Sequence, residues 1–194
     1  MVEPMRVGIL ALQGAFREHA QVLGRLGVET RLVRRPAELE EIEALVIPGG
    51  ESTAIGRLLF EYGLAEKLLA RAREGLPVFG TCAGMVLMAR EIEGIEQRTL
   101  GLMDITVRRN AFGRQIESFE AELQITVLGD KPFRGVFIRA PLVTRVGAGV
   151  EVLAEFEGKP VLVRQGRLLA CAFHPELTDD PRLHRYFLGE VAKA

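Results

Sequence analysis

Residues 6–12 read Arg-Val-Gly-Ile-Leu-Ala-Leu, an apolar run without the alternation of polar and apolar residues found in half-exposed strands. Such a run is typical of a strand buried on both faces of a parallel sheet. Helical spacing follows directly, with apolar residues every three or four positions at Phe16, Ala20, Leu23 and Leu26. Gly27 stands where a helix would end. The chain is therefore expected to begin with a strand followed by a helix.

The same alternation continues through the first half of the chain. Further strands are predicted at residues 28–33, 44–47 and 77–79, a short helix or turn at 36–42, and helical segments at 52–62, 64–74 and 85–91. Parallel neighbours need crossover connections, so this order predicts an open three-layer α/β fold, with a mostly parallel sheet flanked by helices.

From about Met103 the predicted strands come closer together, which indicates a partly antiparallel region. These strands are expected at residues 105–107, 121–127, 136–138, 150–156, 161–164 and 168–173. A final helix is predicted over residues 180–192, capped by Thr178 or Asp179.

Composition narrows the classes of function. The chain has 194 residues, 48% hydrophobic and 26% charged, which predicts one globular domain over residues 1–194. A formal net charge of −1 gives no overall attraction for nucleic acid or an anionic membrane. Since no apolar run reaches the ~18 residues of a membrane span and no secretory signal is evident, we expect a cytoplasmic protein.

Polar and glycine-rich segments follow several of the predicted strands. They are Gln13-Gly14, Pro48-Gly49-Gly50-Glu51-Ser52, Gly80-Thr81-Cys82-Ala83-Gly84 and His174-Pro175-Glu176. Ligand sites of open α/β sheets lie beyond the carboxyl ends of the strands. We therefore expect these four segments to form the functional site.

Gly80-x-Cys82-x-Gly84 has the spacing of a nucleophile elbow with cysteine at its centre. A strand that turns directly into a helix strains its central residue, and flanking glycines allow close backbone approach. The start of the helix favours a thiolate, so Cys82 is expected to be an exposed, activated nucleophile. The alternative is a buried structural cysteine in a glycine-rich turn. Cys171, the other cysteine, is expected in the core.

A cysteine nucleophile needs a base, and the chain has three histidines. His19 and His184 lie in predicted helices, where an exposed or half-buried surface role is the simpler interpretation. His174 follows a strand, and in an extended segment Glu176 would point to the same side and orient the imidazole. The alternative is that both residues merely decorate a turn.

The glycine-rich segment at residues 48–52 lacks the lysine and the spacing of a phosphate-binding loop. The amides of Gly49 and Gly50, with that of Ala83, are better suited to an oxyanion hole. Arg109 is a candidate for binding a substrate carboxylate, with Arg108 and Arg114 around Asn110, although such clusters are often solvated loops. Two cysteines and three histidines show no zinc-ligand spacing, so no metal is expected.

Residues 48–53, 80–84 and 174–176 together resemble class I glutamine amidotransferases. The match narrows further to the glutaminase subunit of pyridoxal 5'-phosphate synthase, which residues 10–19, 109–115, 118–120 and 137–141 resemble. The resemblance runs from about Met5 to the C-terminal helix and implies a flavodoxin-like fold. Residues 1–4 lie outside it as an N-terminal extension, which makes Met5 a candidate for the native start.

The resemblance implies a catalytic triad of Cys82, His174 and Glu176 that hydrolyses L-glutamine to glutamate and ammonia, without a cofactor. It implies glutamine contacts from Gly50, Glu51, Ser52, Arg109, Ile138 and Arg139, and an interface with the synthase subunit at Gln13 and Gly14. That partner is a (β/α)8 barrel, expected in a large hetero-oligomer, which condenses the ammonia with ribose 5-phosphate and glyceraldehyde 3-phosphate.

Two rival interpretations remain open. A related glutaminase, such as the one serving imidazole glycerol phosphate synthesis, would share the triad but lack residues 109–115 and 138–141 as a set. A non-catalytic member of the fold would use Cys82 as a redox sensor or in a binding subunit. Partner-dependent release of ammonia separates the second interpretation from an amidotransferase.

Overall fold

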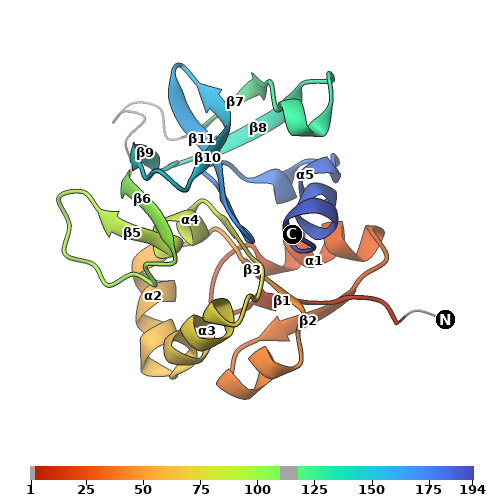
Figure 1. The fold of residues 1–194 in the computed structure, drawn as a ribbon, viewed down its shortest axis with the longest axis vertical. Helices are drawn as coiled ribbons and strands as arrows, with labels where there is room; N and C mark the ends of the chain where they lie inside the picture. Colours follow the sequence, from red (N-terminus) through yellow and green to blue (C-terminus); the bar gives the residue numbers. More distant parts are fainter. Residues whose placement is uncertain (1–2, 110–117) are drawn as a thin grey trace.

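The structure is a computed structural model that describes residues 3–109 and 118–194. The first half alternates strands and helices as predicted (Figure 1). Its elements are β1 Arg6–Leu10, α1 Phe16–Arg25, β2 Glu29–Val33, the 3₁₀ turn Pro36–Glu40, β3 Ala44–Ile47, α2 Ser52–Glu61, α3 Leu64–Arg73, β4 Val78–Thr81 and α4 Ala83–Met88. Gly27 follows α1 with a φ of 76°, as expected for the residue that ends a helix.

The main sheet has seven strands in the order β10-β11-β12-β4-β3-β1-β2. The five strands from β12 to β2 pair in parallel. The parallel part thus runs in the flavodoxin-like order, with β12 as its fifth strand. β10 (Glu151–Phe156) and β11 (Lys159–Gln165) add an antiparallel edge beside β12 (Leu168–Cys171). The prediction of a mostly parallel sheet is confirmed.

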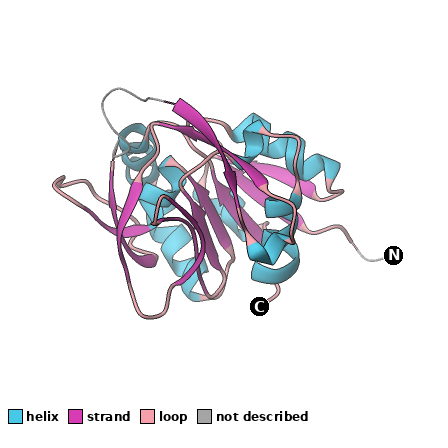
Figure 2. Ribbon diagram, turned by 90° about the horizontal axis from the view of Figure 1, so that it is seen from above, coloured by secondary structure: helices cyan, strands magenta, loops and turns pink. Residues whose placement is uncertain are grey.

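Helices cover both faces of this sheet (Figure 2). Along the sheet, the step from β1 to β2 runs in one direction and the step from β3 to β4 runs in the other. Because crossovers are right-handed, α1 lies on one face of the sheet and α2 and α3 lie on the other face. The C-terminal helix α5, Arg182–Tyr186, lies beside α1 (Figure 1). All four residues of β3 are buried, in keeping with a central strand covered on both faces.

Two smaller sheets lie outside the main one. β5 (Ala89–Ile92), β6 (Met103–Arg108) and β9 (Leu142–Val146) form one sheet, and β7 (Ser118–Leu123) pairs with β8 (Phe133–Ile138) in the other. The helix predicted to reach Glu91 ends at Met88, because residues 89–92 pair with β6 instead. β9 was not predicted, and the strand predicted to reach Val127 ends at Leu123, before a 3₁₀ turn.

The C-terminal helix also differs from its prediction. It begins at Arg182, continues as a π-helical turn over Phe187–Val191, and has no side-chain cap from Thr178 or Asp179. Asp180 instead accepts a hydrogen bond from the Arg182 amide at 3.0 Å. A carboxylate close to the first turn thus takes the place of the predicted cap.

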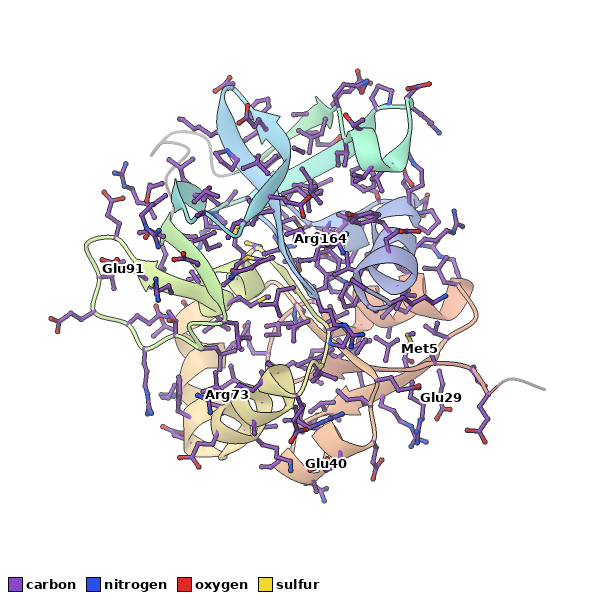
Figure 3. The ribbon with its side chains drawn as sticks, in the orientation of Figure 1. Met5, Glu29, Glu40, Arg73, Glu91 and Arg164 are labelled. Atoms are coloured by element: carbon purple, nitrogen blue, oxygen red, sulfur yellow. The ribbon has the colours of Figure 1, made fainter. Side chains whose placement is uncertain are left out.

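Charged side chains such as Glu40, Arg73 and Glu91 extend from the outside of the molecule (Figure 3). The core between the layers is built from apolar side chains, with Phe79, Phe173 and Phe187 fully buried. Among the described residues, no helix is long and apolar enough to cross a membrane.

Two glycines allow α4 to pack directly against the strands. A Cβ on Gly84 would overlap the carbonyl oxygen of Ile47 in β3. A Cβ on Gly80 would lie 2.7 Å from the Gly84 carbonyl oxygen and 2.5 Å from Met88 Sδ. The turn between β4 and α4 therefore depends on glycine on both sides of its central residue.

We expect Gly84→Ala to lower the free energy of unfolding by about 1–3 kcal/mol, the usual cost of overpacking. Chemical denaturation provides the measurement. Gly24→Ala is the matched control, because a Cβ there meets nothing within 4 Å. Alanine in this helical position should instead stabilise by up to about 1 kcal/mol. Equal effects of the two substitutions would contradict this account of the turn.

Candidate active site

Cys82 occupies the turn between β4 and α4 with a φ of 51° and a ψ of −106°. A positive φ is costly for a residue with a Cβ and persists only where the surroundings impose it. The predicted strain of the elbow is confirmed. The residue is less exposed than expected, at 7% of its surface, because it lies at the base of a cavity. Its sulfur lies 3.7 Å from the carbonyl oxygen of Ile138, at the end of β8.

His174 and Glu176 meet as predicted, although the segment is not extended. Residues 175–177 form a 3₁₀ turn. His174 Nδ1 lies 2.6 Å from Glu176 Oε1, and both side chains are buried. The His174 amide donates to the carbonyl of Val136 at 2.8 Å, which ties the segment to β8. The turn, rather than the two-residue period of a strand, brings the carboxylate to the imidazole.

The surroundings of His174 favour its protonated form. Burial lowers the pKa of this imidazole, but hydrogen bonds to Cys82 and Glu176, and their negative charges, outweigh burial and raise it to about 10. Cys171, the other cysteine, is fully buried, and burial raises the pKa of its thiol well above the ordinary value. Its predicted place in the core is confirmed.

A cavity of about 360 Å³ opens above Cys82. Its lining includes Gly14, Gly49, Gly50, Glu51, Ser52, Cys82, Ala83, Arg109, Ile138, Arg139 and His174. These residues come from the carboxyl ends of β1, β3, β4 and β12, and from β6 and β8. The structure thus brings together the residues predicted for the triad, the glutamine contacts and the oxyanion hole, with Glu176 behind His174 and Gln13 beside the loop after β3.

The loop after β3 is held by the loop after β1. The Glu51 amide donates to Gln13 Oε1 at 2.8 Å, and the Ala15 amide donates to the Gly49 carbonyl at 2.9 Å. Gly14 has a φ of 102°, and a Cβ on it would overlap the Gly49 carbonyl oxygen. Residues 13–15 are thus joined to the predicted oxyanion loop by two hydrogen bonds and a close backbone contact.

Arg109 and Glu51 form a charged pair in the cavity wall, with 3.5 Å between Arg109 Nη2 and Glu51 Oε1. The Glu51 carboxylate also caps α2 by accepting from the amides of Thr53 and Ala54. Burial raises the pKa of Glu51, but these hydrogen bonds and the charge of Arg109 outweigh it and lower the pKa.

Gln97 is a site residue that the sequence did not indicate. Its side-chain oxygen accepts from Arg109 Nη1 at 2.9 Å, and its nitrogen donates to the Ser52 carbonyl at 3.2 Å. It thereby joins Arg109 to the start of α2. A lone glutamine in a loop carries no motif, so only the structure reveals this role.

The prediction for His19 and His184 is wrong. Both are fully buried rather than on the surface, and His19 Nδ1 lies 2.8 Å from His184 Nε2. His19 Nε2 lies 3.1 Å from Thr81 Oγ1 and 3.5 Å from Glu176 Oε2. Because α1 and α5 pack side by side on the sheet, both rings are enclosed beneath the site.

Part of the predicted arginine cluster falls outside the described residues. These residues are Asn110 and Arg114, with the segment between them. Arg108 is not part of the cavity lining and pairs with Glu93 at 2.5 Å. Residues 3–109 and 118–194 contain no cluster of three or more potential metal ligands.

Comparison with known proteins agrees with this geometry. Residues 9–193 match the SNO glutamine amidotransferase family. The chain is 65% identical over 190 residues to a pyridoxal 5'-phosphate synthase subunit PdxT from Pelotomaculum thermopropionicum, covering 98% of this chain and 97% of that relative. It is 61% identical over 184 residues to PdxT from Thermus thermophilus, covering 94% and 95%.

Solved structures show the same fold. A crystal structure of a glutamine amidotransferase, 57% identical in sequence, matches 97% of this chain and 99% of its own with a TM-score of 0.92. PurLQS from Thermotoga maritima, at 17% identity, matches 96% of this chain and 98% of its own with a TM-score of 0.71, a likeness of fold alone. The chain therefore belongs to the SNO glutamine amidotransferase family and is an enzyme that hydrolyses glutamine.

Proposed function

We propose that Cys82, His174 and Glu176 form a triad that hydrolyses L-glutamine and supplies the ammonia to a pyridoxal 5'-phosphate synthase subunit. The observation that carries the proposal is the strained Cys82 at the base of a cavity, beside a histidine whose Nδ1 lies 2.6 Å from a buried carboxylate. Relatives named as subunits of that synthase support the partner.

In the first half of the reaction, the Cys82 thiolate attacks the side-chain amide carbon of glutamine. The carbonyl oxygen becomes an oxyanion, and the amides of Ala83, Gly49 and Gly50 are the donors assigned to it. Ala83 is the first residue of α4, and the first amides of a helix have no partner within the helix. His174 then gives its proton to the leaving nitrogen, so the C–N bond breaks, ammonia leaves and a γ-glutamyl thioester remains.

Water completes the cycle. Neutral His174 takes a proton from the water that attacks the thioester, and the C–S bond breaks to release glutamate and the thiolate. Glu176 stays bound to Nδ1, which keeps Nε2 directed at the reacting atoms. A high pKa of His174 suits the first step, because the imidazolium that protonates the leaving nitrogen is then present before substrate arrives.

The charged pair in the cavity wall matches the two charges of the amino-acid end of glutamine. We assign the substrate carboxylate to Arg109, whose planar fork suits that group. We assign the ammonium group to Glu51. Gly50, Ser52, Ile138 and Arg139 complete the glutamine site, and Arg139 adopts a φ of 45° at the cavity wall.

Docking of the synthase is assigned to Gln13 and Gly14. Their contacts with Gly49 and Glu51 link this surface to the oxyanion loop. A barrel partner that moves residues 13–15 would thereby control hydrolysis, so that ammonia forms only where the synthase receives it. We assign the partner to a (β/α)8 barrel, with which the chain is expected to form a large hetero-oligomer.

The first test measures ammonia release from glutamine with and without the cognate synthase subunit. We expect strong stimulation by the partner, and loss of turnover in Cys82→Ala and His174→Asn with the fold intact by circular dichroism. Cys171→Ala is the matched control and should retain turnover. Activity in either triad variant, or none from the wild-type complex, would overturn the proposal and favour a binding subunit.

A second test addresses the substrate carboxylate. Arg109→Ala should raise KM for glutamine by about 10- to 100-fold, because a hydrogen bond to a charged group contributes about 1.5–3 kcal/mol. Arg108→Ala removes the same charge one residue away, where it pairs with Glu93. It should leave KM unchanged. Steady-state kinetics with the synthase present give both values, and an unchanged KM in Arg109→Ala would contradict the assignment.

A third test concerns pH. Because the pKa of His174 rises from about 6.5 when unfolded to about 10 when folded, its contribution to stability is complete below about 6.5 and lost as pH rises through 10. The free energy of unfolding should therefore fall over this range in the wild type, and less in His174→Asn. Denaturation at several pH values measures it. Equal slopes in the two proteins would contradict the charged pair.

A further inference from the structure

Glu176 has one carboxylate oxygen that the proposed triad does not use. Oε1 faces His174, whereas Oε2 is buried and has no hydrogen-bond partner among the described residues. A buried carboxylate oxygen without a donor is costly. The side chain that faces it is His19 of α1, whose Nε2 lies 3.5 Å from Oε2. The protonation state of His19 therefore affects how firmly Glu176 is held.

His19 belongs to a closed group of side chains. Its Nδ1 lies 2.8 Å from His184 Nε2, and its Nε2 lies 3.1 Å from the hydroxyl of Thr81, the residue before Cys82. The ring of Phe79 packs against both imidazoles, with centroids 6.5 Å from His19 and 5.7 Å from His184. The group thus joins α1, β4 and α5 directly beneath the triad.

Both histidines of this group are neutral at neutral pH. Burial lowers the pKa of His19 well below its ordinary value, and the charges of His184 and His174 lower it further. Burial and the charge of Arg25 lower the pKa of His184 to about 3. Each ring therefore carries one N–H, and the contact between the rings holds a single proton.

The available hydrogen-bond partners determine which nitrogen atoms carry these protons. If His19 donated from Nδ1, the His184 proton would sit on Nδ1, which is buried and has no partner among the described residues. The unprotonated Nε2 of His19 would then face the Glu176 carboxylate, lone pair to lone pair. In the opposite arrangement, His184 donates from Nε2 to His19 Nδ1, and His19 directs its Nε2–H at Thr81 Oγ1 and Glu176 Oε2. The unpartnered Nδ1 of His184 is then an acceptor rather than a buried N–H, and no lone pair of His19 faces the carboxylate.

We propose that His19 is a positioning residue, a neutral imidazole whose Nε2–H faces Glu176 Oε2 and holds that carboxylate in line with His174. The inference rests on the proposed triad. A neutral donor suits this position because a second cation beside Glu176 would weaken its interaction with the His174 imidazolium. The carboxylate is then fixed from both sides, by His174 on Oε1 and by His19 on Oε2.

Few titratable groups surround this carboxylate. His174 lies on its own segment, His19 on α1 and Cys82 at the elbow, while the Cys171 thiol of β12 responds to its charge. His184 on α5 stands behind His19, and Arg25 acts on His184. The His174 imidazole lies 2.6 Å from Glu176 Oε1, so a change in the titration of His174 reports on the carboxylate.

The test uses the full chain labelled with ¹⁵N-histidine, because imidazole nitrogen shifts in NMR distinguish the two neutral tautomers and the cation. In the wild type we expect His19 neutral and protonated on Nε2 at pH 7. A charged His19, or one protonated on Nδ1, would overturn the proposal. This measurement needs no variant, so it remains decisive should a substitution prevent folding.

The variants then test the effect on the triad. His19→Leu should lower the titration midpoint of His174 by about one unit, as expected for a weakened carboxylate partner. It should also reduce kcat about 10- to 100-fold, with KM nearly unchanged. His19→Gln retains a hydrogen-bond donor, so both the His174 midpoint and kcat should stay close to their wild-type values. Phe79→Leu disturbs the packing of the same rings without removing a polar atom, so the midpoint should stay in place.

An unchanged His174 midpoint in His19→Leu would overturn the inference, as would an equal shift in Phe79→Leu. Failure of the proposed function is distinct from these outcomes. It would appear as turnover in Cys82→Ala or His174→Asn, or as an inactive wild-type complex, none of which depends on the tautomer of His19.

Discussion

The site depends on one backbone constraint, the positive φ of Cys82 between β4 and α4. An L-residue adopts that conformation only where its surroundings leave no other, and here the surroundings are the close packing of α4 on β3 and β4. Gly80 and Gly84 make that packing possible, because a Cβ on either would overlap backbone. A single tight turn thus fixes the direction of the sulfur, the start of the helix behind it and the base of the cavity.

The parallel sheet brings the other loops of the site to this turn. Parallel strands end at a common edge, so the loops after β1, β3, β4 and β12 meet there although they lie far apart in the sequence. The hydrogen bonds of Gln13 and Ala15 to the Gly49–Glu51 loop join two of these loops to each other. The opposite charges of Glu51 and Arg109 face the same cavity as Cys82, which is the arrangement a small zwitterionic amide needs.

Much of the fold and of the candidate site could be predicted from the sequence, wherever the spacing of residues has a direct physical meaning. Buried strands are apolar without alternation, and an elbow needs glycine on both sides of Cys82, so the parallel sheet, the elbow and the His174–Glu176 contact could be predicted. Contacts between segments that lie far apart in the sequence could not be predicted. β5 was predicted as helix because only its pairing with β6 makes it a strand. Gln97 lies in a stretch without a motif and His19 in a predicted helix, and their contacts arise from what α2, α5 and Glu176 place beside them.

The central claim is that Cys82 attacks the amide of glutamine and carries the γ-glutamyl group. Rapid acid quenching of the complex with its synthase during turnover, followed by peptide mass spectrometry, tests it most directly. We expect a γ-glutamyl group on the peptide that contains Cys82 and none on the peptide that contains Cys171. Ammonia release without modification of Cys82, or with the group on another residue, would contradict it.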